Sequence, residues 1–232
     1  MTHRLSLMLW SWILFVPAIS FAEESVVKLK AGDRIIFLGD SITQGGVGPN
    51  GYVTMIRQAL EKKHADLKLE VIGAGISGNK VPDLQRRVDK DVIAKKPTIV
   101  VIYIGINDVW HGEKDPAKGT IPEAFVAGLK EVIGKCRDAG TTVVLCTPSV
   151  IGEKLDGANS LDAKLDEYSD LSRKLAKELK LPLCDLRKAF LEHIKAHNKD
   201  NAEKGILTSD RVHLNQAGNQ FVADTMLKTL DP

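Results

Sequence analysis

Two pairs of residues in this chain have the types and spacing needed for nucleophilic chemistry. Asp40 directly precedes Ser41, and His213 follows Asp210 by three positions. A serine hydroxyl becomes an effective nucleophile when a neighbouring base takes its proton, and a histidine oriented by a carboxylate can be that base. In a turn, the Asp-x-x-His spacing can place the carboxylate against one ring nitrogen and leave the other free to face Ser41. Each pair also has a purely structural alternative. Ser41 could simply cap a helix, and Asp210 could be a capping residue beside a partly buried histidine.

The segment before Ser41 predicts where that serine lies. Residues 34–38 form an apolar run typical of a buried strand, and Gly39 with the two capping residues that follow predicts a sharp exit into a turn or helix. Ser41 is therefore expected at the carboxyl end of a strand, where open α/β sheets bind their ligands.

Two further segments offer donors for the anion that forms when a serine attacks a carbonyl. The candidates are the backbone N–H groups of Ser41 and Gly78 and the side-chain amide of Asn107. Gly78 lies in the glycine-rich segment 73–79, in which Gly75 is a competing glycine, and Asn107 follows the apolar run 98–104. Donors aimed at such an oxyanion typically contribute about 3 to 4 kcal/mol each.

Other residues near these exits, or suited to metals, give weaker signals. Trp110 and His111 open the polar loop 109–119 and could contact a substrate, although a solvated loop histidine is an equal alternative. His193 and His197 are one helical turn apart, but Glu192 precedes the pair, unlike in the metalloprotease helix signature. We predict an exposed helix face there and no metal site, and a solvated position for His64.

Helical segments separate the predicted strands throughout the chain, which predicts right-handed crossovers and a parallel sheet covered on both faces. We expect a three-layer α/β/α sandwich with a flavodoxin-like, five-stranded parallel sheet in the order 2-1-3-4-5. The predicted strands are 34–38, 67–72, 98–104, 141–146 and 181–186, and the predicted helices are 52–63, 81–96, 122–139, 161–179, 188–198 and one capped by Asn215 that ends near 230.

The overall composition suits one globular domain and excludes one class of partner. The 232 residues are 44% hydrophobic and 27% charged, which is ordinary for a chain able to bury a sizeable core. The 32 basic and 30 acidic residues leave a net charge of +2 without a basic patch, so no nucleic-acid partner is expected.

The N-terminus has the pattern of a secretory signal peptide. A short cationic start precedes the apolar run 5–16, and small residues stand at Ser20 and Ala22. We predict a signal peptide over residues 1–22, a single domain over 23–232, and export to the periplasm or the extracellular space, with no stable membrane insertion after cleavage. An uncleaved anchor is the competing interpretation, although serines and a proline interrupt the apolar run.

Three cysteines, Cys136, Cys146 and Cys184, do not form a disulfide framework by number or spacing. We interpret them as buried small hydrophobic residues, and the sequence leaves open whether two of them pair.

Four short blocks, in this order along the chain, make it similar to the SGNH, or GDSL-type, hydrolase family. They are Gly39-Asp40-Ser41-Ile42-Thr43, Gly75-Ile76-Ser77-Gly78-Asn79, Gly105-Ile106-Asn107-Asp108 and Asp210-Arg211-Val212-His213. The resemblance implies a serine esterase in which Ser41 is the nucleophile, His213 the base and then acid, and Asp210 its orienting carboxylate. Ser41, Gly78 and Asn107 would form the oxyanion hole.

The same resemblance implies that Asp40 and Asp108 are structural and bond loop amides, and that no metal or organic cofactor is required. We expect the substrate to be a short acyl ester, such as an acetyl group on an extracellular carbohydrate or a small ester, selected by loops 109–119 and 148–160. One alternative is a lysophospholipase or thioesterase acting on long acyl chains. A second is a binding module that cradles a phosphate ligand with Ser41, Thr43 and Gly45. The sequence predicts no oligomeric state.

Overall fold

The computed structural model describes residues 27–231. The predicted signal peptide and the predicted domain start at residue 23 lie outside the described residues. Among the residues described, no helix is both long enough and apolar enough to cross a bilayer.

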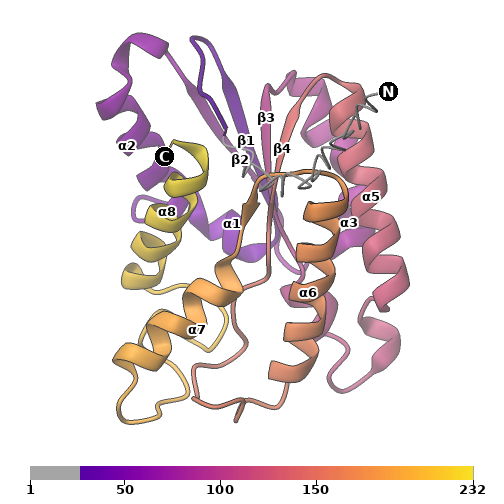
Figure 1. Ribbon diagram of the computed structural model, residues 1–232, viewed down its shortest axis with the longest axis vertical. Coiled ribbons are helices and arrows are strands. Elements are labelled where there is room, and N and C mark those ends of the chain that lie inside the picture. The colour runs from indigo at the N-terminus through magenta and orange to yellow at the C-terminus, as the bar shows by residue number, and fades with distance from the viewer. Residues whose placement is uncertain (1–26, 232) are drawn as a thin grey trace, which may run out of the picture.

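Five strands and eight α-helices alternate along the described chain, with three short 3-10 turns between them (Figure 1). The strands are β1 (Arg34–Gly39), β2 (Glu70–Gly75), β3 (Ile99–Tyr103), β4 (Thr142–Cys146) and β5 (Leu183–Cys184). The helices are α1 (Ser41–Gly46), α2 (Tyr52–Lys63), α3 (Val81–Asp91), α4 (Ile106–Trp110), α5 (Pro122–Asp138), α6 (Asp162–Glu178), α7 (Leu186–His197) and α8 (Gln216–Leu230).

All strand pairs are parallel, and the sheet order is β2-β1-β3-β4-β5, which confirms the predicted topology. The register places Gly39 at the end of β1 opposite both Gly75 of β2 and Tyr103 of β3. The carboxyl ends of these three neighbouring strands are therefore level, so the segments that follow them start at one edge of the sheet.

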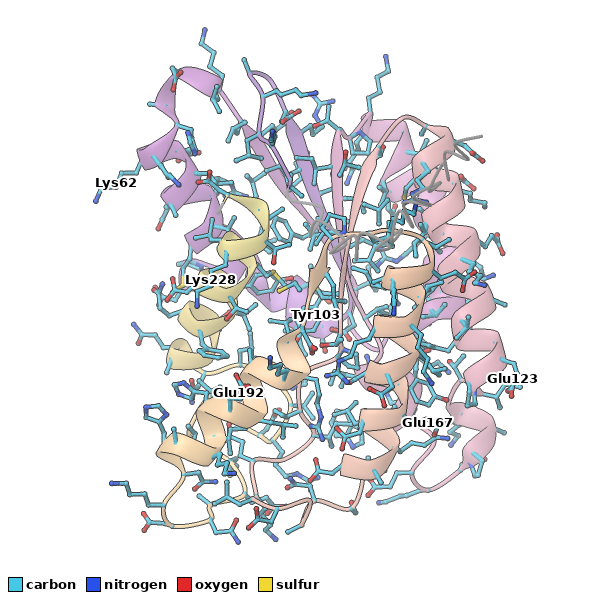
Figure 2. All side chains as sticks on the ribbon, viewed as in Figure 1. Lys62, Tyr103, Glu123, Glu167, Glu192 and Lys228 are labelled. Atoms are coloured by element: carbon cyan, nitrogen blue, oxygen red, sulfur yellow. The ribbon has the colours of Figure 1, made fainter. Side chains whose placement is uncertain are left out.

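Two helical layers cover the sheet. Helices α2 and α8 pack together on one side with α7 beside α8, and α3, α5 and α6 form the other layer (Figure 1). The sheet supplies the centre of the core, because every residue of β3 is buried. Charged side chains such as Lys62, Glu123 and Glu192 extend outward, whereas Tyr103 lies inside the molecule (Figure 2).

Several predicted boundaries are wrong for identifiable local reasons. The second strand begins at Glu70 rather than residue 67, because a 3-10 turn ends at Leu67 and Lys68 adopts a left-handed conformation with φ of 49°. The same strand continues through the glycines to Gly75. The predicted helix 81–96 ends at Asp91, and only a short 3-10 turn follows it.

The structure also specifies the elements at the carboxyl end of the sheet. Of the two predicted exits after Gly39, a turn or a helix, it shows the short helix α1, whereas α4 extends into the segment predicted as the loop 109–119. The fifth strand contains only Leu183 and Cys184, because the Asp185 side chain caps α7 by accepting a hydrogen bond from the Lys188 N–H.

The three cysteines are free and buried, as expected for small hydrophobic side chains. Cys146 and Cys184 lie opposite one another on β4 and β5, whereas Cys136 belongs to α5.

Gly75 sets how closely α1 approaches the sheet. A Cβ at this position would overlap the backbone nitrogen of Gln44 and lie 2.6 Å from the carbonyl oxygen of Asp40. Both obstacles are backbone atoms that no rotamer change can move. The glycine therefore allows the serine-bearing helix to pack directly on the end of β2.

Replacing Gly75 with alanine should destabilise the protein by about 2 to 3 kcal/mol, because the added methyl group forces α1 away from β2. Urea denaturation measures the change. Gly134→Ala is the matched control, since a Cβ there meets no atom within 4 Å inside helix α5. The control should gain about 0.5 to 1 kcal/mol, and equal effects of the two substitutions would contradict the packing argument.

Candidate active site

Ser41 is the first residue of α1 and stands directly after the end of β1. Asp40 is the N-cap of this helix, and its Oδ1 accepts a hydrogen bond of 2.9 Å from the Ile42 N–H. The first N–H groups of a helix have no partner inside the helix. The cap thus holds the Ser41 side chain and its N–H at the edge where β1, β2 and β3 end.

His213 joins Ser41 to Asp210 although the serine lies far away in the sequence. The Ser41 Oγ and the His213 Nε2 are 2.8 Å apart, and the His213 Nδ1 lies 2.7 Å from the Asp210 Oδ2. The carboxylate favours a proton on Nδ1, which leaves Nε2 able to accept the serine proton. The three predicted residues therefore form one continuous chain of hydrogen bonds.

A tight hairpin before α8 presents Asp210 and His213. Thr208 and Leu214 form an antiparallel bridge, and the Ser209 N–H donates to the His213 carbonyl. At the tip, Arg211 has a φ of 85°, in the left-handed region. This turn brings the Asp210 carboxylate within reach of the His213 ring and of the His213 N–H, which donates to its Oδ1.

Hydrogen bonds keep the Asp210 side chain ionised. Partial burial alone would raise the pKa of this carboxyl, but donation from the His213 ring and from the His213 and Val212 N–H groups outweighs burial and lowers it. Asp210 is thus a carboxylate under neutral conditions, as an orienting partner for a protonated imidazole must be.

Gly78 and Asn107 follow β2 and β3 and flank the Ser41 edge. Gly78 has a φ of 75°, which favours glycine at this position. The Asn107 Nδ2 donates to the Asn79 carbonyl at 3.1 Å. An amide carries two N–H donors, so this bond fixes the side chain and leaves one donor for a ligand.

Arg87 of α3 was not among the predicted site residues, yet it connects two parts of the site. Its Nη2 donates to the Gly39 carbonyl at 2.7 Å, and its Nε donates to the Asn79 Oδ1 at 2.6 Å. The guanidinium therefore ties the end of β1 to the Gly78 segment. An arginine in the middle of an amphipathic helix gives no sequence signal for this role.

Trp110 is the last residue of α4, the helix that contains Asn107, and His111 is its C-cap. The Cε1 of His111 would lie 3.9 Å from a Cβ placed on Gly78, so the ring borders the Gly78 segment. Burial, followed by the nearby charge of Lys80, lowers the pKa of His111. A neutral imidazole is therefore the form found beside the candidate site.

Asp40 and Asp108 are buried, and each accepts a hydrogen bond from a backbone N–H in the first turn of a helix rather than from a loop amide, α1 for Asp40 and α3 for Asp108. The Asp108 Oδ1 accepts from the Val81 N–H at 3.1 Å, in the same manner as Asp40 accepts from Ile42. Burial raises the pKa of Asp40 to about 7 and that of Asp108 to about 6. Both aspartates are only 2% exposed.

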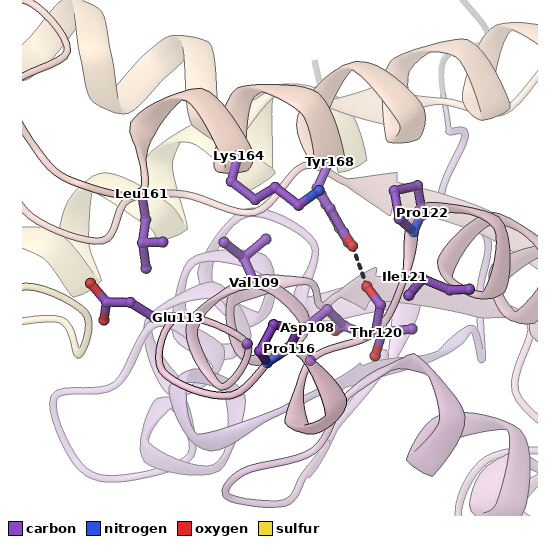
Figure 3. Close-up of a pocket in the computed structure, with 12 residues that line it drawn as sticks. Asp108, Val109, Glu113, Pro116, Thr120, Ile121, Pro122, Leu161, Lys164 and Tyr168 are labelled. Atoms are coloured by element: carbon purple, nitrogen blue, oxygen red, sulfur yellow. Dashed lines mark hydrogen bonds between the residues drawn. The ribbon is translucent and has the colours of Figure 1, made fainter.

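A pocket of about 420 Å³ lies between segment 108–122, which includes the end of α4, and helix α6 (Figure 3). The Tyr168 hydroxyl crosses it to donate to the Thr120 carbonyl. Its lining combines apolar, polar and charged side chains, including Val109, Glu113, Ile121, Leu161 and Lys164.

Among the described residues, His64, His193 and His197 do not join the site. The prediction of a solvated His64 is wrong, because its Nε2 lies 2.9 Å from the Asp231 Oδ2. The rings of His193 and His197 stack at 4.0 Å between centroids on α7. Residues 27–231 contain no group of three or more His, Cys, Asp or Glu side chains placed to hold a metal ion.

Comparison with known proteins agrees with this geometry. Residues 37–221 match the GDSL-like lipase/acylhydrolase family. The chain is 31% identical over 219 residues to an acetylxylan esterase of Geobacillus stearothermophilus, covering 88% of this chain and 96% of the relative. A crystal structure of the acetyl xylan esterase AlAXEase superimposes with a TM-score of 0.81 at 46% identity, covering 84% of this chain and 98% of that one.

A more distant relative has a different activity in its name. The chain is 24% identical to thioesterase 1/protease 1/lysophospholipase L1 of Escherichia coli K12 over 208 residues, covering 88% of this chain and 86% of the relative.

Asp40→Asn should change how stability depends on pH. Because the pKa of Asp40 rises from 3.8 unfolded to about 7 folded, the folded state binds the extra proton between these values. Asp40 therefore makes stability fall as pH rises from about 4 to 7, by up to about 1.4 kcal/mol per pH unit. Asparagine retains an oxygen acceptor for Ile42 and does not titrate.

Urea denaturation at pH 4, 5, 6, 7 and 8 measures this effect as the difference between the two proteins, in which the other titrating groups cancel. The asparagine variant should gain stability relative to the native protein as the pH rises through this window. A difference that stays constant from pH 4 to 8 would show that the Asp40 carboxyl titrates normally.

Proposed function

This chain belongs to the GDSL-like lipase/acylhydrolase family, and on that basis we propose that it is a serine esterase that uses Ser41, His213 and Asp210 and removes short acyl groups, above all acetyl groups from carbohydrate. The continuous hydrogen-bond chain from the Ser41 Oγ through the His213 ring to the Asp210 carboxylate carries the proposal. Such a chain supplies a nucleophile, a base and an orienting group in one place.

The reaction proceeds in two halves. The Ser41 Oγ attacks the ester carbonyl carbon while the His213 Nε2 takes its proton, and the tetrahedral intermediate collapses as the bond to the alcohol oxygen breaks. His213 gives that proton to the departing alcohol. Water then attacks the acyl-enzyme, again losing a proton to His213, which returns it to Ser41 as the carboxylic acid leaves.

The negative charge of each intermediate falls on the former carbonyl oxygen, and three donors serve as its oxyanion hole. They are the Ser41 and Gly78 N–H groups and the Asn107 side-chain amide. The level ends of β1, β2 and β3 support this assignment, since each strand supplies one donor at the same edge. The Asn79 carbonyl and Arg87 hold these donors before substrate binds, as electrostatic preorganisation requires.

The acetyl and carbohydrate parts of the proposal rest on the relatives and on the rim of the site. The acetylxylan esterase and AlAXEase both have acetylated xylan in their names and align over nearly their whole lengths. His111 borders the Gly78 segment, where a neutral imidazole can hydrogen-bond a sugar hydroxyl. The Trp110 ring lies 6.4 Å from the His111 ring between centroids and can supply a stacking surface.

Hydrolysis of long acyl chains is the second candidate, and the Escherichia coli relative is the observation that favours it. The pocket between segment 108–122 and α6 does not resemble an acyl channel, because Glu113 and Lys164 are part of its lining. A long methylene chain would gain little binding free energy beside these charged side chains, so we favour the short acyl group.

A phosphate-binding module explains the site less well. The Thr43 hydroxyl is buried and lies 2.8 Å from the Tyr52 hydroxyl, so it cannot help to cradle an anion. This alternative also gives no role to the contact between His213 and Ser41.

We also propose that the protein is exported, and only the signal-peptide pattern of residues 1–22 supports this part of the proposal. A polymeric substrate outside the cell would suit an exported esterase.

Ser41→Ala should lower the turnover of a chromogenic acetyl ester by at least about 10⁴-fold, because within residues 27–231 no other hydroxyl is hydrogen-bonded to the His213 ring. Labelling with a fluorophosphonate should be lost in the same variant. Ser209→Ala is the matched control, because its hydroxyl is on the same hairpin and bonds only the His213 carbonyl. Normal turnover by the Ser41 variant would disprove the assignment.

A substrate panel separates short from long acyl groups. Acetylated xylo-oligosaccharides, chromogenic esters with two to sixteen acyl carbons, an acyl-CoA and a lysophospholipid should be compared by kcat/KM. We expect acetate release from the oligosaccharides and a decline in rate as the acyl chain lengthens. Faster cleavage of long chains, with no acetate released from any glycan, would select the second candidate instead.

A further inference from the structure

The loop between β4 and α6 contains a carboxylate for which the proposed reaction has no direct use. Glu153 is completely buried. Its Oε1 accepts from the N–H groups of Leu207 and Thr208, each at 2.7 Å, and its Oε2 accepts from the Ile206 N–H at 2.8 Å. A buried carboxylate is costly unless hydrogen bonds receive its charge. Three successive backbone amides do so here.

These amides belong to the first arm of the hairpin that presents Asp210 and His213. Leu207 accepts from the Asn215 N–H at 3.0 Å, and Thr208 is bridged to Leu214 on the second arm. Only Ser209 separates Thr208 from Asp210. The Glu153 carboxylate therefore binds the backbone at the base of this hairpin.

Backbone bonds from the same loop reach two more points around the hairpin. The Gly152 N–H donates to the Arg211 carbonyl at 2.8 Å, and the Glu153 N–H donates to the Glu203 carbonyl at 2.9 Å. The loop thus holds the tip of the hairpin, its base and the segment that leads into it.

Asn198, at the end of α7, anchors the loop from the other side. Its Nδ2 donates to the Glu153 carbonyl at 2.7 Å, and its Oδ1 accepts from the Ala202 N–H at 2.8 Å. Asn198 is itself 1% exposed. Glu153 is therefore fixed to the helical layer and can act as a rigid support.

The Asp210 and His213 side chains are only weakly held by packing, in contrast to the buried Val212 between them. Asp210 is 52% exposed and His213 is 40% exposed, so little of either side chain is enclosed by neighbours. Their position relative to the Ser41 Oγ therefore depends on the hairpin backbone that carries them. Glu153 binds the arm of that hairpin that leads directly into Asp210.

Resting on the proposed function, we propose that Glu153 is a positioning residue, whose buried carboxylate fixes the 206–208 backbone and so holds the Asp210 and His213 pair within reach of Ser41. Its effect is on the reaction geometry, because it touches neither the substrate nor the reacting atoms.

The chemistry of three N–H donors requires a carboxylate of this length. Glutamine has one oxygen and one NH₂ group, and the NH₂ group would face an N–H donor in place of accepting from it. Glu153→Gln therefore loses at least one of the three bonds while its volume is unchanged. Glu153→Asp keeps the charge but is one methylene shorter.

The test is steady-state hydrolysis of a chromogenic acetyl ester by Glu153→Gln. We expect kcat to fall roughly 10- to 100-fold with KM nearly unchanged, and the rate of fluorophosphonate labelling to fall in parallel. The low-field proton resonance of the hydrogen bond between His213 and Asp210 should broaden or shift. Glu153→Asp should recover part of the lost kcat. If the glutamine variant does not fold, the aspartate variant tests the proposal in its place, and we expect its kcat to be reduced with KM nearly unchanged.

Two controls separate positioning from stability and from a simple change of charge. Glu203→Gln makes the same chemical change at an exposed side chain that pairs with Arg211 on this hairpin, and it should keep wild-type kcat. Val132→Ala removes two methyl groups from a buried position of α5. Its urea midpoint measures how much stability is lost, and its kcat shows how much activity that loss of stability removes by itself.

The proposal fails if Glu153→Gln loses no more kcat than Val132→Ala at matched loss of stability, or if only KM changes. It also fails if the aspartate variant is no more active than the glutamine variant. An active Ser41→Ala protein would overturn the proposed function, whereas an inactive one beside a fully active Glu153→Gln would overturn only the role of Glu153.

Discussion

The candidate site depends on one constraint, the parallel register that makes β1, β2 and β3 end at the same level. Gly39 stands opposite both Gly75 and Tyr103, so the residues after each strand begin at a common edge. Such an edge collects unpaired N–H groups and helix starts. Ser41, Gly78 and Asn107 all belong to segments that leave this edge, each after a different strand. The glycine at 75 then lets α1 lie against the sheet.

Much of this arrangement could be predicted because it follows from periodicity and strand direction. Buried strands produce apolar runs, and helices between them require parallel strands with aligned exits. The position of Ser41 at such an exit was therefore predictable from residues 34–41. The pairing of His213 with Asp210 was predictable from their spacing, since a three-residue separation in a turn brings the two side chains together, as the hairpin at Arg211 does.

Other features depend on contacts that leave no local trace in the sequence. The late start of β2 depends on the left-handed Lys68, a conformation that lysine rarely adopts. Arg87 resembles any charged residue on a helix, and Glu153 resembles any polar residue in a long loop. Both act on backbone atoms distant in the chain, and a backbone acceptor or donor has no residue type by which to recognise it.

Ser41 and His213, the nucleophile and base of the proposed mechanism, are far apart in the sequence, and this separation has a consequence for biosynthesis. Ser41 begins the helix that follows the first strand, and its partner His213 is 172 residues later, shortly before the last helix. When the chain emerges from the ribosome or from a translocation pore, Ser41 emerges early and His213 emerges close to the end. Under the proposed mechanism, every incomplete chain is chemically inert toward esters, and hydrolytic activity begins only when the C-terminal hairpin docks.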